Sequence, residues 1–246
     1  MSKHSNRIPI GPFELHDRIA KGGMGEIWQG IHRHQNVAVA VKVLTAEQMR
    51  QAGYQADFLR EVEAVAALSH PGIIMLFDHG FVTDEIAERA SGSLVAGSPY
   101  LVMELASRGS LDALTLPLSW YDFRRIVSAL LRALAHAHSR GLIHLDIKPG
   151  NVLLGSRDDP RPNLKLTDFG LVHALDRQQP CSSGASPHGT VEQARGTPWY
   201  MAPEQLCGHW RDYGPWTDLY ALGILAWELV CGARPYDGNS ARSIGR

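Results

Sequence analysis

Four polar side chains in the middle of the sequence have the types and the spacing to move a phosphoryl group. Asp146 can accept a hydrogen bond from an attacking hydroxyl group and take up its proton, and Lys148 can steady the charge of a transferred phosphate. Asn151 and Asp168 offer a carbonyl oxygen and a carboxylate, which are hard ligands suited to Mg²⁺. Together they predict phosphoryl transfer from a magnesium-bound nucleotide, although the Pro-Gly pair between them would, on its own, fit a plain turn.

A glycine-rich segment lies near the N-terminus, between two stretches with the composition of strands. Glycines in such a place let backbone N–H groups approach phosphate oxygens without obstruction by a Cβ atom. On the glycines alone, a plain β-turn is the simpler interpretation. The segment consists of Ile19, Ala20, Lys21, Gly22, Gly23, Met24, Gly25, Glu26 and Ile27.

A lysine in an apolar strand is the next candidate. The run Val37–Leu44 is rich in β-branched residues, which predicts a buried strand, and alternation places Ala40 and Lys42 on one face. A small residue there leaves room for a flat ligand beside a lysine that can reach phosphates, but a lysine exposed on an edge strand would give the same pattern. Glu61 lies on or beside the apolar stripe of a helix predicted over Gln55–Leu68. Because an unpaired buried carboxylate is costly, Glu61 and Lys42 can neutralise each other.

The secondary structure that must position these residues is expected to change from mainly strands to mainly helices after about residue 105. The first part is mostly β with one marked helix, and apolar residues at helical spacing then predict a long amphipathic helix that Gly141 ends. The expected segments of the first part are a flexible lead-in at residues 1–12, strands within Phe13–Leu44, the helix Gln55–Leu68, a strand at Ile73–Val82, a hairpin loop at Thr83–Pro99 and a strand at Tyr100–Leu105. Those of the second part are the long helix Phe123–His138, short strands at Ile143, Val152–Leu154 and Leu164–Leu166, an irregular stretch at Leu171–Ala202 and a helix at about Trp216–Val230.

The composition is that of a soluble globular protein. The 246 residues suit one large domain or two lobes, 44% of them are hydrophobic, and a net charge of -1 gives no reason to expect nucleic acid as a partner. Three scattered cysteines fit a reducing compartment, and the 12 histidines lack zinc-like spacing. The N-terminus has no secretory signal, and the longest apolar stretch, Ala221–Trp227, is too short to span a bilayer. We therefore expect a cytoplasmic protein without a membrane segment.

The motifs occur in a recognisable order. The glycine loop comes first and is followed by the strand lysine and the helix glutamate. Next come the D-x-x-x-x-N and D-F-G stretches, which carry the four residues above, and then an A-P-E at Ala202–Glu204. In this order the chain resembles the eukaryotic-like (Hanks-type) Ser/Thr protein kinases from about Phe13 to its end, and the string around the glycines looks most like bacterial members. The resemblance implies an α+β, bilobal protein kinase fold. Its β-rich N-lobe with one helix would span about 13–105, and its mainly helical C-lobe about 106–246.

The resemblance implies a role for each nucleotide-binding position. Lys42 would hold the α- and β-phosphates of ATP and pair with Glu61, and Met103 would lie at the back of the adenine pocket. A hinge from Glu104 to Ala106 would bind adenine through its backbone. The remaining members are the residues from Ile19 to Ile27, which would cover the nucleotide, and Ala40, which would leave room for it.

The resemblance also implies the catalytic set. Asp146 would be the catalytic base, and Asn151 and Asp168 would hold Mg²⁺. Thr197 would contact Asp146 and Lys148.

The implied activity is transfer of the γ-phosphoryl group of ATP to Ser or Thr hydroxyl groups of proteins, with the chain itself a candidate substrate. Lys148 and the segment Gly196–Tyr200 are typical of Ser/Thr kinases rather than tyrosine kinases. The alternative is a pseudokinase-like nucleotide-binding scaffold or regulatory module, which is motivated by Ala20 in place of the first loop glycine and by Leu145. A small-molecule phosphotransferase is disfavoured because the peptide-positioning segment up to Glu204 is well formed.

Leu145 departs from the family pattern most clearly. The family commonly has an arginine at this position, whose guanidinium pairs with a phosphate on the activation loop. We therefore expect an activity that does not depend on phosphorylation through residue 145. The loop still offers Ser182, Ser183, Ser186 and Thr190, so a loss of activity when all four are replaced by alanine would contradict this hypothesis.

The end of the sequence is the other departure. Kinase domains of this family normally continue with several helices, so we expect either that the given sequence is a fragment of a longer kinase or that the C-lobe is truncated at Arg246. The arginine that usually pairs with the carboxylate at Glu204 would lie in the missing part, whereas Asp218 would anchor the catalytic loop from the large helix. We expect an extended chain to be more stable and more active, because the apolar face of that helix would be covered.

Overall fold

The structure, a computed structural model, describes residues 7–22, 25–45, 54–155, 164–169 and 198–236. The chain forms two units. The first comprises Met1–Ala67 and Ile74–Ala106, and the second comprises Leu68–Ile73 and Ser107–Arg246.

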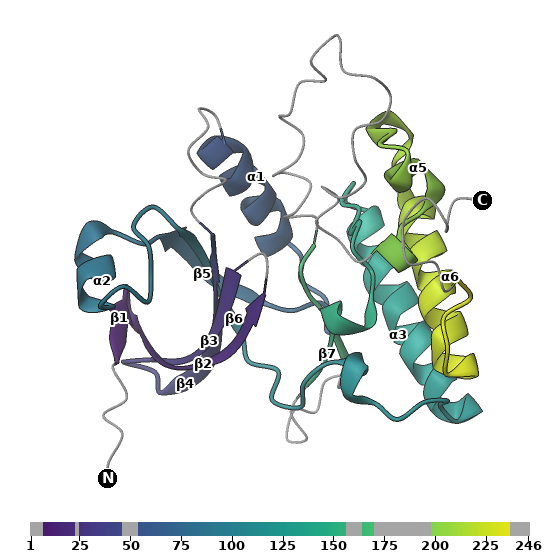
Figure 1. The fold of residues 1–246 in the computed structure, drawn as a ribbon, viewed down its shortest axis with the longest axis horizontal. Coiled ribbons are helices and arrows are strands. Elements are labelled where there is room, and N and C mark those ends of the chain that lie inside the picture. The colour runs from purple at the N-terminus through teal and green to yellow at the C-terminus, as the bar shows by residue number, and fades with distance from the viewer. Residues whose placement is uncertain (1–6, 23–24, 46–53, 156–163, 170–197, 237–246) are drawn as a thin grey trace. The chain divides into compact units, whose positions relative to one another are not determined.

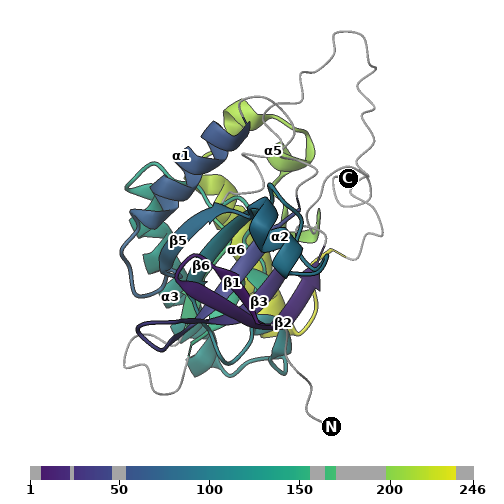
Figure 2. The same ribbon diagram turned by 90° about the vertical axis from the view of Figure 1, so that its left-hand side faces the viewer.

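The first unit is built on one antiparallel sheet with the strand order β1-β2-β3-β4-β6-β5 (Figure 1). Helix α1 contacts the edge strand β5, and helix α2 contacts the opposite edge strand β1 (Figures 1 and 2). The elements are β1 (Ile8–Ile10), β2 (Phe13–Gly22), β3 (Gly25–His32), β4 (Val37–Leu44), α1 (Tyr54–Ala66), β5 (Leu76–Phe81), α2 (Asp84–Arg89) and β6 (Pro99–Glu104).

Apolar side chains from the first strand, β1, to the last strand in sequence, β6, form the core of this unit. Strand β4 lies inside the sheet between β3 and β6, and its β-branched residues suit that position because they pack well on a pleated surface. Each fully buried large aliphatic side chain contributes roughly 1.5–3 kcal/mol through removal from water. The buried members of the core are Ile8, Ile10, Phe13, Leu15, Trp28, Val39, Val41, Val43, Val82, Ala90, Leu94, Tyr100 and Val102.

The described part of the second unit is mainly helical, with α3 and α6 packed side by side (Figure 1). Ser119 caps α3, since its Oγ accepts a hydrogen bond from the Asp122 backbone N–H at 3.1 Å. Helix α6 ends at Gly232, whose φ of 73° is in the left-handed region that favours glycine. The elements, with η marking 3₁₀ turns, are η2 (Leu111–Ala113), α3 (Trp120–His138), η3 (Pro149–Asn151), β7 (Val152–Leu154), β8 (Leu164–Leu166), η5 (Pro198–Tyr200), α5 (Pro203–Leu206), η6 (Trp210–Asp212) and α6 (Pro215–Cys231).

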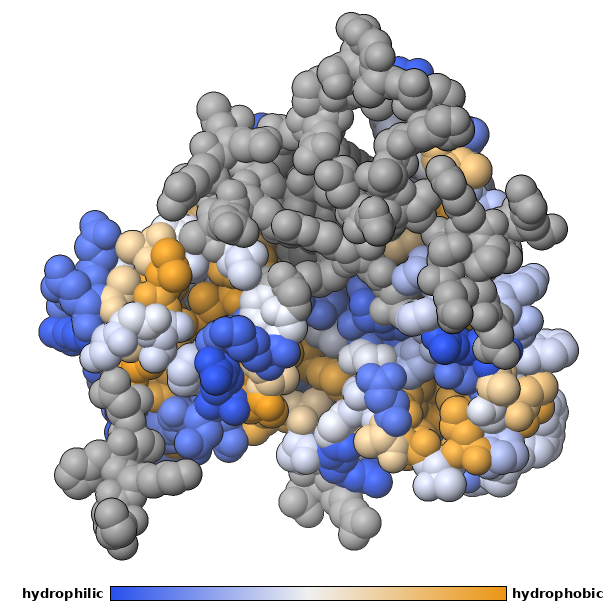
Figure 3. Space-filling model, in the orientation of Figure 1, coloured by the Kyte–Doolittle hydropathy of each residue, from blue (hydrophilic) through white to orange (hydrophobic). Residues whose placement is uncertain are grey.

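Large apolar side chains remain on the surface of the second unit. Figure 3 shows apolar surface, in orange, over the region that α3 and α6 occupy in Figure 1. On α6, the side chains of Trp216, Leu219, Trp227 and Val230 are between 46% and 61% exposed. Within the described parts of the chain, no helix combines the length and the apolar character needed to cross a membrane.

Most predicted elements are present, and the α+β class is confirmed. The predicted strand Val37–Leu44 is β4, the predicted helix Gln55–Leu68 is α1, and the long helix Phe123–His138 is α3, which begins three residues earlier. The short strands β7 and β8 have the predicted bounds, and α6 extends the predicted Trp216–Val230 by one residue at each end.

Three predictions need correction. Part of the expected flexible lead-in is the strand β1, because Ile8 and Ile10 are buried in the core and pair with β2. The expected loop Thr83–Pro99 contains the helix α2, so the first unit has two helices; the Thr83 hydroxyl oxygen accepts from the Ile86 backbone N–H at 3.3 Å and caps it. Ile143 lies outside any strand.

The expected strand Ile73–Val82 is also shorter than predicted. It is β5, which begins at Leu76, while Ile73 forms an isolated bridge to Leu166 in the second unit. The first unit ends at Ala106, and residues 68–73 belong to the second.

Candidate active site

The glycine-rich segment is the turn between β2 and β3. Gly22 pairs with Gly25 in the strand register, while Gly23 and Met24 lie outside the described residues. Gly25 has a φ of 144°, and a Cβ atom added there would lie 2.1 Å from the carbonyl oxygen of Val43. No other residue fits at Gly25 without moving β4, so the start of β3 requires glycine.

Side chains around this turn are open to solvent on β2. Ile19 is 53% exposed, and Ala20 and Lys21 are exposed as well. The Nζ atom of Lys21 lies 3.0 Å from Oε1 of the half-buried Glu26, and Ile27 is half-buried beside it on β3. An exposed glycine hairpin that carries a cation suits contact with a phosphate-bearing ligand.

Strands β4 and β6 bring three predicted nucleotide residues together. Ala40 pairs with Met103 across the two strands, and Lys42 follows on the same face of β4. Each of the three is only 7% exposed. The alternative of a lysine exposed on an edge strand is therefore wrong, because β4 is an interior strand and Lys42 is buried.

The end of β6 is held to the strand before it. Glu104 donates its backbone N–H to the Met75 carbonyl oxygen at 3.0 Å, and its Oε1 accepts from the Met75 backbone N–H at 2.9 Å. Ala106 is half-buried at the end of this unit. Glu61 is half-buried on α1, and its pairing with Lys42 stays a prediction.

In the second unit, Asp146 is the centre of a small polar cluster. Its Oδ2 accepts hydrogen bonds from Lys148 Nζ and from Asn151 Nδ2, each at 2.8 Å, and Asn151 Nδ2 also donates to the Asp146 carbonyl oxygen at 2.8 Å. The side chains of Asp146 and Lys148 are 15% and 19% exposed, and Asn151 is buried. Both side-chain bonds use Oδ2 of Asp146.

The buried His144 connects this cluster to the segment that carries Asp168. Its Nδ1 accepts from the Asp146 backbone N–H at 3.2 Å, so its Nε2 carries the proton and donates to the Thr167 carbonyl oxygen at 2.8 Å. The ring of Phe169 packs on the His144 ring with the centroids 4.5 Å apart, and both residues are buried. The neutral imidazole therefore fixes the spacing of the two stretches.

The two predicted metal ligands come from adjacent backbone segments. Strands β7 and β8 pair Val152 with Leu166, and the next residue pair is joined by a 3.0 Å bond from Thr167 N–H to the Asn151 carbonyl oxygen. Asp168 follows directly, half-buried, with a φ of 64° that turns its backbone out of the strand direction.

The donor set fits a hard divalent cation. Asn151 uses its amide nitrogen in both hydrogen bonds to Asp146, which leaves its amide oxygen as the candidate ligand beside the carboxylate of Asp168. Among the described residues, no group of three or more His, Cys, Asp or Glu side chains could hold a metal by itself. Two protein oxygens suit Mg²⁺, which usually keeps waters and takes substrate phosphates as its other ligands.

The loop that carries Asp146 is anchored to α6 through a fully buried carboxylate. Oδ2 of Asp218 accepts from the His144 backbone N–H at 2.8 Å, and Oδ1 accepts from the Leu145 backbone N–H at 2.7 Å. Nε2 of His138, on α3, lies 2.7 Å from the same Oδ2. The anchoring role expected for Asp218 thus has a geometric basis, whereas His138 was expected only as the last residue of the predicted helix Phe123–His138.

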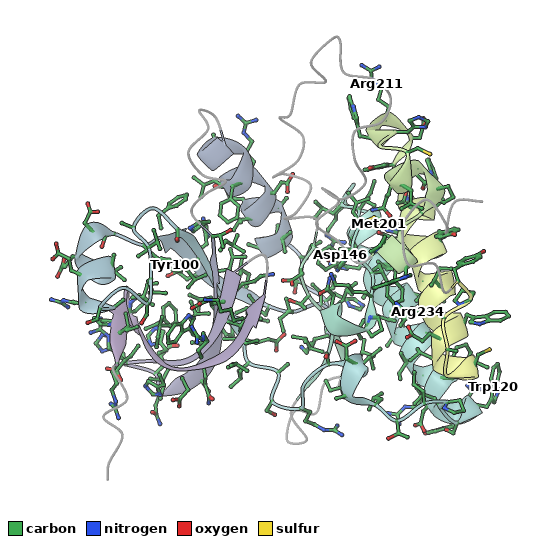
Figure 4. The ribbon with its side chains drawn as sticks, in the orientation of Figure 1. Tyr100, Trp120, Asp146, Met201, Arg211 and Arg234 are labelled. Atoms are coloured by element: carbon green, nitrogen blue, oxygen red, sulfur yellow. The ribbon has the colours of Figure 1, made fainter. Side chains whose placement is uncertain are left out.

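Helix α5 is linked to both the loop and α6 (Figure 4 labels Asp146 on the loop and Met201, which precedes this helix). Glu204 Oε1 accepts from the Thr217 hydroxyl group at 2.7 Å, and Gln205 Nε2 donates to the Leu145 carbonyl oxygen at 2.8 Å. Neither Thr217 nor Gln205 could be predicted from residue spacing, because both contacts join residues that are distant along the chain.

The segment before α5 contains a second buried polar contact. The hydroxyl group of Tyr200 donates to Oε2 of Glu228 on α6. Burial, reinforced by this bond, raises the pKa of Tyr200 far above its usual value, so the phenol stays a proton donor. The Arg234 guanidinium stacks 4.1 Å from the centre of the Trp199 ring, and Thr197 lies outside the described residues.

The chain is similar to known proteins over nearly its whole length. A family model described as the protein kinase domain matches residues 13–245. The serine/threonine-protein kinase PknA of Mycobacterium tuberculosis (strain ATCC 25618 / H37Rv) is 35% identical over 237 residues, which cover 95% of this chain and 50% of PknA. Pkn1 of Myxococcus xanthus, also a serine/threonine-protein kinase, is 35% identical over 94% of this chain and 30% of its own length. The crystal structure of the Mycobacterium tuberculosis PknI kinase domain superposes with a TM-score of 0.68 at 26% identity, covering 96% of this chain and 80% of that one.

Proposed function

Since the chain belongs to the protein kinase domain family and to its bacterial serine/threonine type, we propose that it transfers the γ-phosphoryl group of ATP to Ser and Thr hydroxyl groups of proteins. The chain spans half the length of PknA, so the activity, substrates and partners of the whole protein are part of this proposal. The observation that carries it is the pair of hydrogen bonds that fixes Oδ2 of Asp146.

Asp146 would act as the catalytic base through Oδ1. Because Lys148 and Asn151 hold Oδ2, the carboxylate cannot rotate freely, and Oδ1 accepts the hydrogen bond of the substrate hydroxyl group and takes its proton late in the transfer. Lys148 would neutralise charge that develops on the transferred phosphoryl group. Thr197 would contribute a contact to Asp146 and Lys148.

The first unit would supply the nucleotide contacts. Lys42 would bind the α- and β-phosphates with Glu61 as its partner, and the neighbouring pair Ala40 and Met103 would leave a flat apolar surface for adenine. Backbone groups from Glu104 to Ala106 would bind the adenine edge. The glycine turn, with Ile19, Ala20, Lys21, Gly22, Gly23, Met24, Gly25, Glu26 and Ile27, would cover the phosphates.

Asn151 and Asp168 would hold Mg²⁺. When bound, the ion neutralises phosphate charge and orients the terminal phosphate for in-line attack. Asn151 serves both the metal and the base, because its nitrogen holds Asp146 while its oxygen faces away from that bond.

The setting of the protein follows from the same proposal. Protein Ser and Thr residues are the acceptors, and the chain's own residues are candidates for autophosphorylation. Cys207 and Cys231 are free and exposed, which fits a cytoplasmic location.

A phosphate-transfer assay with matched variants tests the proposal. We expect Mg²⁺-dependent transfer of radiolabelled phosphate from ATP to a generic protein substrate, and a loss of roughly 10²–10⁴-fold in kcat for Asp146→Asn. Lys42→Met should be similarly inactive because the phosphates lose their cation. Transfer that does not exceed these two variants would refute the proposal, and nucleotide binding without transfer would favour a regulatory scaffold instead.

A further inference from the structure

Five residues of the second unit close a ring of contacts around the loop that carries Asp146. Glu204 and Gln205 are neighbours in α5, and Thr217 and Asp218 are neighbours in α6. Thr217 donates to Glu204 at 2.7 Å, Gln205 donates to the Leu145 carbonyl oxygen at 2.8 Å, and Leu145 donates its N–H to Asp218 at 2.7 Å. The ring therefore joins α5, the loop and α6, and Leu145 is its member closest to the catalytic aspartate.

The backbone at Leu145 needs these contacts. Its φ of 65° is in the left-handed region, where a residue other than glycine is disfavoured by roughly 1–2 kcal/mol. Such a conformation persists only where the surroundings determine it. Asp218 holds the N–H of Leu145 and Gln205 holds its C=O, and the held C=O belongs to the peptide group that leads into Asp146.

The amide of Gln205 makes two separable contacts. Its Oε1 accepts from the Ala202 backbone N–H at 3.1 Å, a local bond that stabilises the start of α5. Its Nε2 reaches across 60 positions of sequence to the Leu145 carbonyl oxygen. Capping of α5 uses only the side-chain oxygen of Gln205, so capping does not account for the hydrogen bond that its nitrogen donates to Leu145.

Residue 145 itself offers no charged group for such a link. The Leu145 side chain cannot pair with an anion, and the hydrogen bond from α5 reaches the backbone carbonyl oxygen of Leu145. A hydrogen bond between a neutral amide and a carbonyl oxygen is independent of phosphorylation and depends little on salt.

We propose that Gln205 is a positioning residue for Asp146, which couples the folded state of α5 to the catalytic loop through the Leu145 carbonyl group. The inference rests on the proposed kinase function, since Asp146 is the base only in that reaction. In this proposal, the hydrogen bond of the uncharged Gln205 amide to the Leu145 carbonyl oxygen joins α5 to the loop that carries Asp146.

Two substitutions separate the contacts of Gln205. Gln205→Glu keeps an oxygen for the Ala202 N–H but removes the donor to Leu145, whereas Gln205→Met, of similar size, removes both. One hydrogen bond of this kind corresponds to a change of about tenfold, so we expect kcat to fall about tenfold in both variants with KM for ATP within about twofold of the wild type. Gln29→Glu, the same chemical change on an exposed residue of β3, is the control and should leave kcat unchanged.

Amide hydrogen exchange of the full chain tests the hydrogen bond between Gln205 and Leu145 independently of kinase activity. The N–H groups of His144 and Leu145 are bonded to Asp218, so they should exchange slowly in the wild type and about ten times faster in Gln205→Glu. The amide of Leu225, buried in α6, should not change. This pattern would show that the loop, rather than the whole unit, responds.

The outcomes distinguish the two proposals. If exchange at residues 144 and 145 is unchanged in Gln205→Glu, the link is refuted whatever the kcat. If exchange accelerates but kcat equals that of an active wild type, the link exists and the positioning role is refuted. If exchange accelerates while even the wild type shows no Asp146-dependent transfer, the link is supported and the kinase proposal fails.

Discussion

The two units hold their candidate site residues by different physical means. In the first unit, steric fit constrains the backbone at Gly25, where an added Cβ atom would clash with β4, and the small Ala40 pairs with Met103. In the second unit, a network of hydrogen bonds holds the loop around Asp146, and three of its donors, the His138 ring and the N–H groups of His144 and Leu145, reach the buried Asp218.

This difference predicts how substitutions destabilise each unit. A steric arrangement is lost when one atom is added, and the damage stays near the added atom. A buried polar network is lost when one partner is removed, because the remaining groups are left without hydrogen bonds at a cost of about 1–3 kcal/mol each. Substitutions can therefore test whether the contrast between the units is real.

The largest effect is expected for Asp218→Asn. The amide oxygen of Asn can replace only one of the two carboxylate oxygens, so at most two of the three donors that now reach Asp218 keep an acceptor, while the new NH₂ group would face a backbone N–H. Since the carboxylate is fully buried, we expect a loss of about 3–5 kcal/mol in the free energy of unfolding, together with a loss of kinase activity. Urea denaturation followed by fluorescence measures the first quantity.

The matched control is Asp212→Asn, the same change on an exposed residue of the second unit. It should alter the free energy of unfolding by less than about 0.5 kcal/mol. Equal stability losses for the two variants would show that the network around Asp218 is not what holds the second unit.

A smaller effect, confined to the first unit, is expected for Gly25→Ala. The added Cβ would lie 2.1 Å from the Val43 carbonyl oxygen, so β3 and β4 must separate locally at a cost of about 2–3 kcal/mol. We expect a raised Kd for ATP, measured by calorimetry.

Gly22→Ala provides the comparison for stability within the same turn. Nothing lies within 4 Å of a Cβ atom at Gly22, and its φ is not in the left-handed region. Its melting temperature should stay close to that of the wild type. If both glycine variants unfold at the same temperature, steric fit at Gly25 does not determine the stability of the hairpin.

The contrast also explains which parts of the site the sequence could predict. Asp146, Lys148 and Asn151 lie within six positions, so a local motif carries both their identity and their contacts. The Lys42 environment followed from the alternation of a β-branched strand, which also predicted the bounds of β4. Such features depend on short-range geometry, which residue spacing encodes directly.

The remaining contacts depend on chain segments that meet only in the folded protein. Gln205 and Leu145 are 60 positions apart, and neither residue type specifies the other. The strand β1 was missed because three residues are too few for a periodic pattern, and their pairing with β2 decides the structure. In α2, the Thr83 cap was a usable local signal, but the polar composition favoured a loop.

The smallest expected effect concerns pH and a pair of histidines in the second unit. The rings of His70 and His136 lie 5.1 Å apart, and burial, followed by nearby positive charges, lowers the pKa of both. The charges acting on His70 are His136, Arg132 and Lys165, and the charge acting on His136 is Arg140.

The sign of the pH dependence follows from these lowered pKa values. The unfolded chain binds protons at His70 and His136 near pH 6.5, before the folded chain does, so the free energy of unfolding falls as the pH drops below about 6.5. His136→Gln removes one of the two groups but keeps an oxygen that can meet Arg140, whose Nη1 lies 3.2 Å from Nδ1 of His136. We expect the decrease in melting temperature between pH 7.5 and pH 5.5 to be smaller in this variant by about 1–2 °C, because the partly exposed rings are screened by solvent. Calorimetry at both pH values measures this difference, and an equal or larger decrease in the variant would show that His136 does not set the acid sensitivity of this unit.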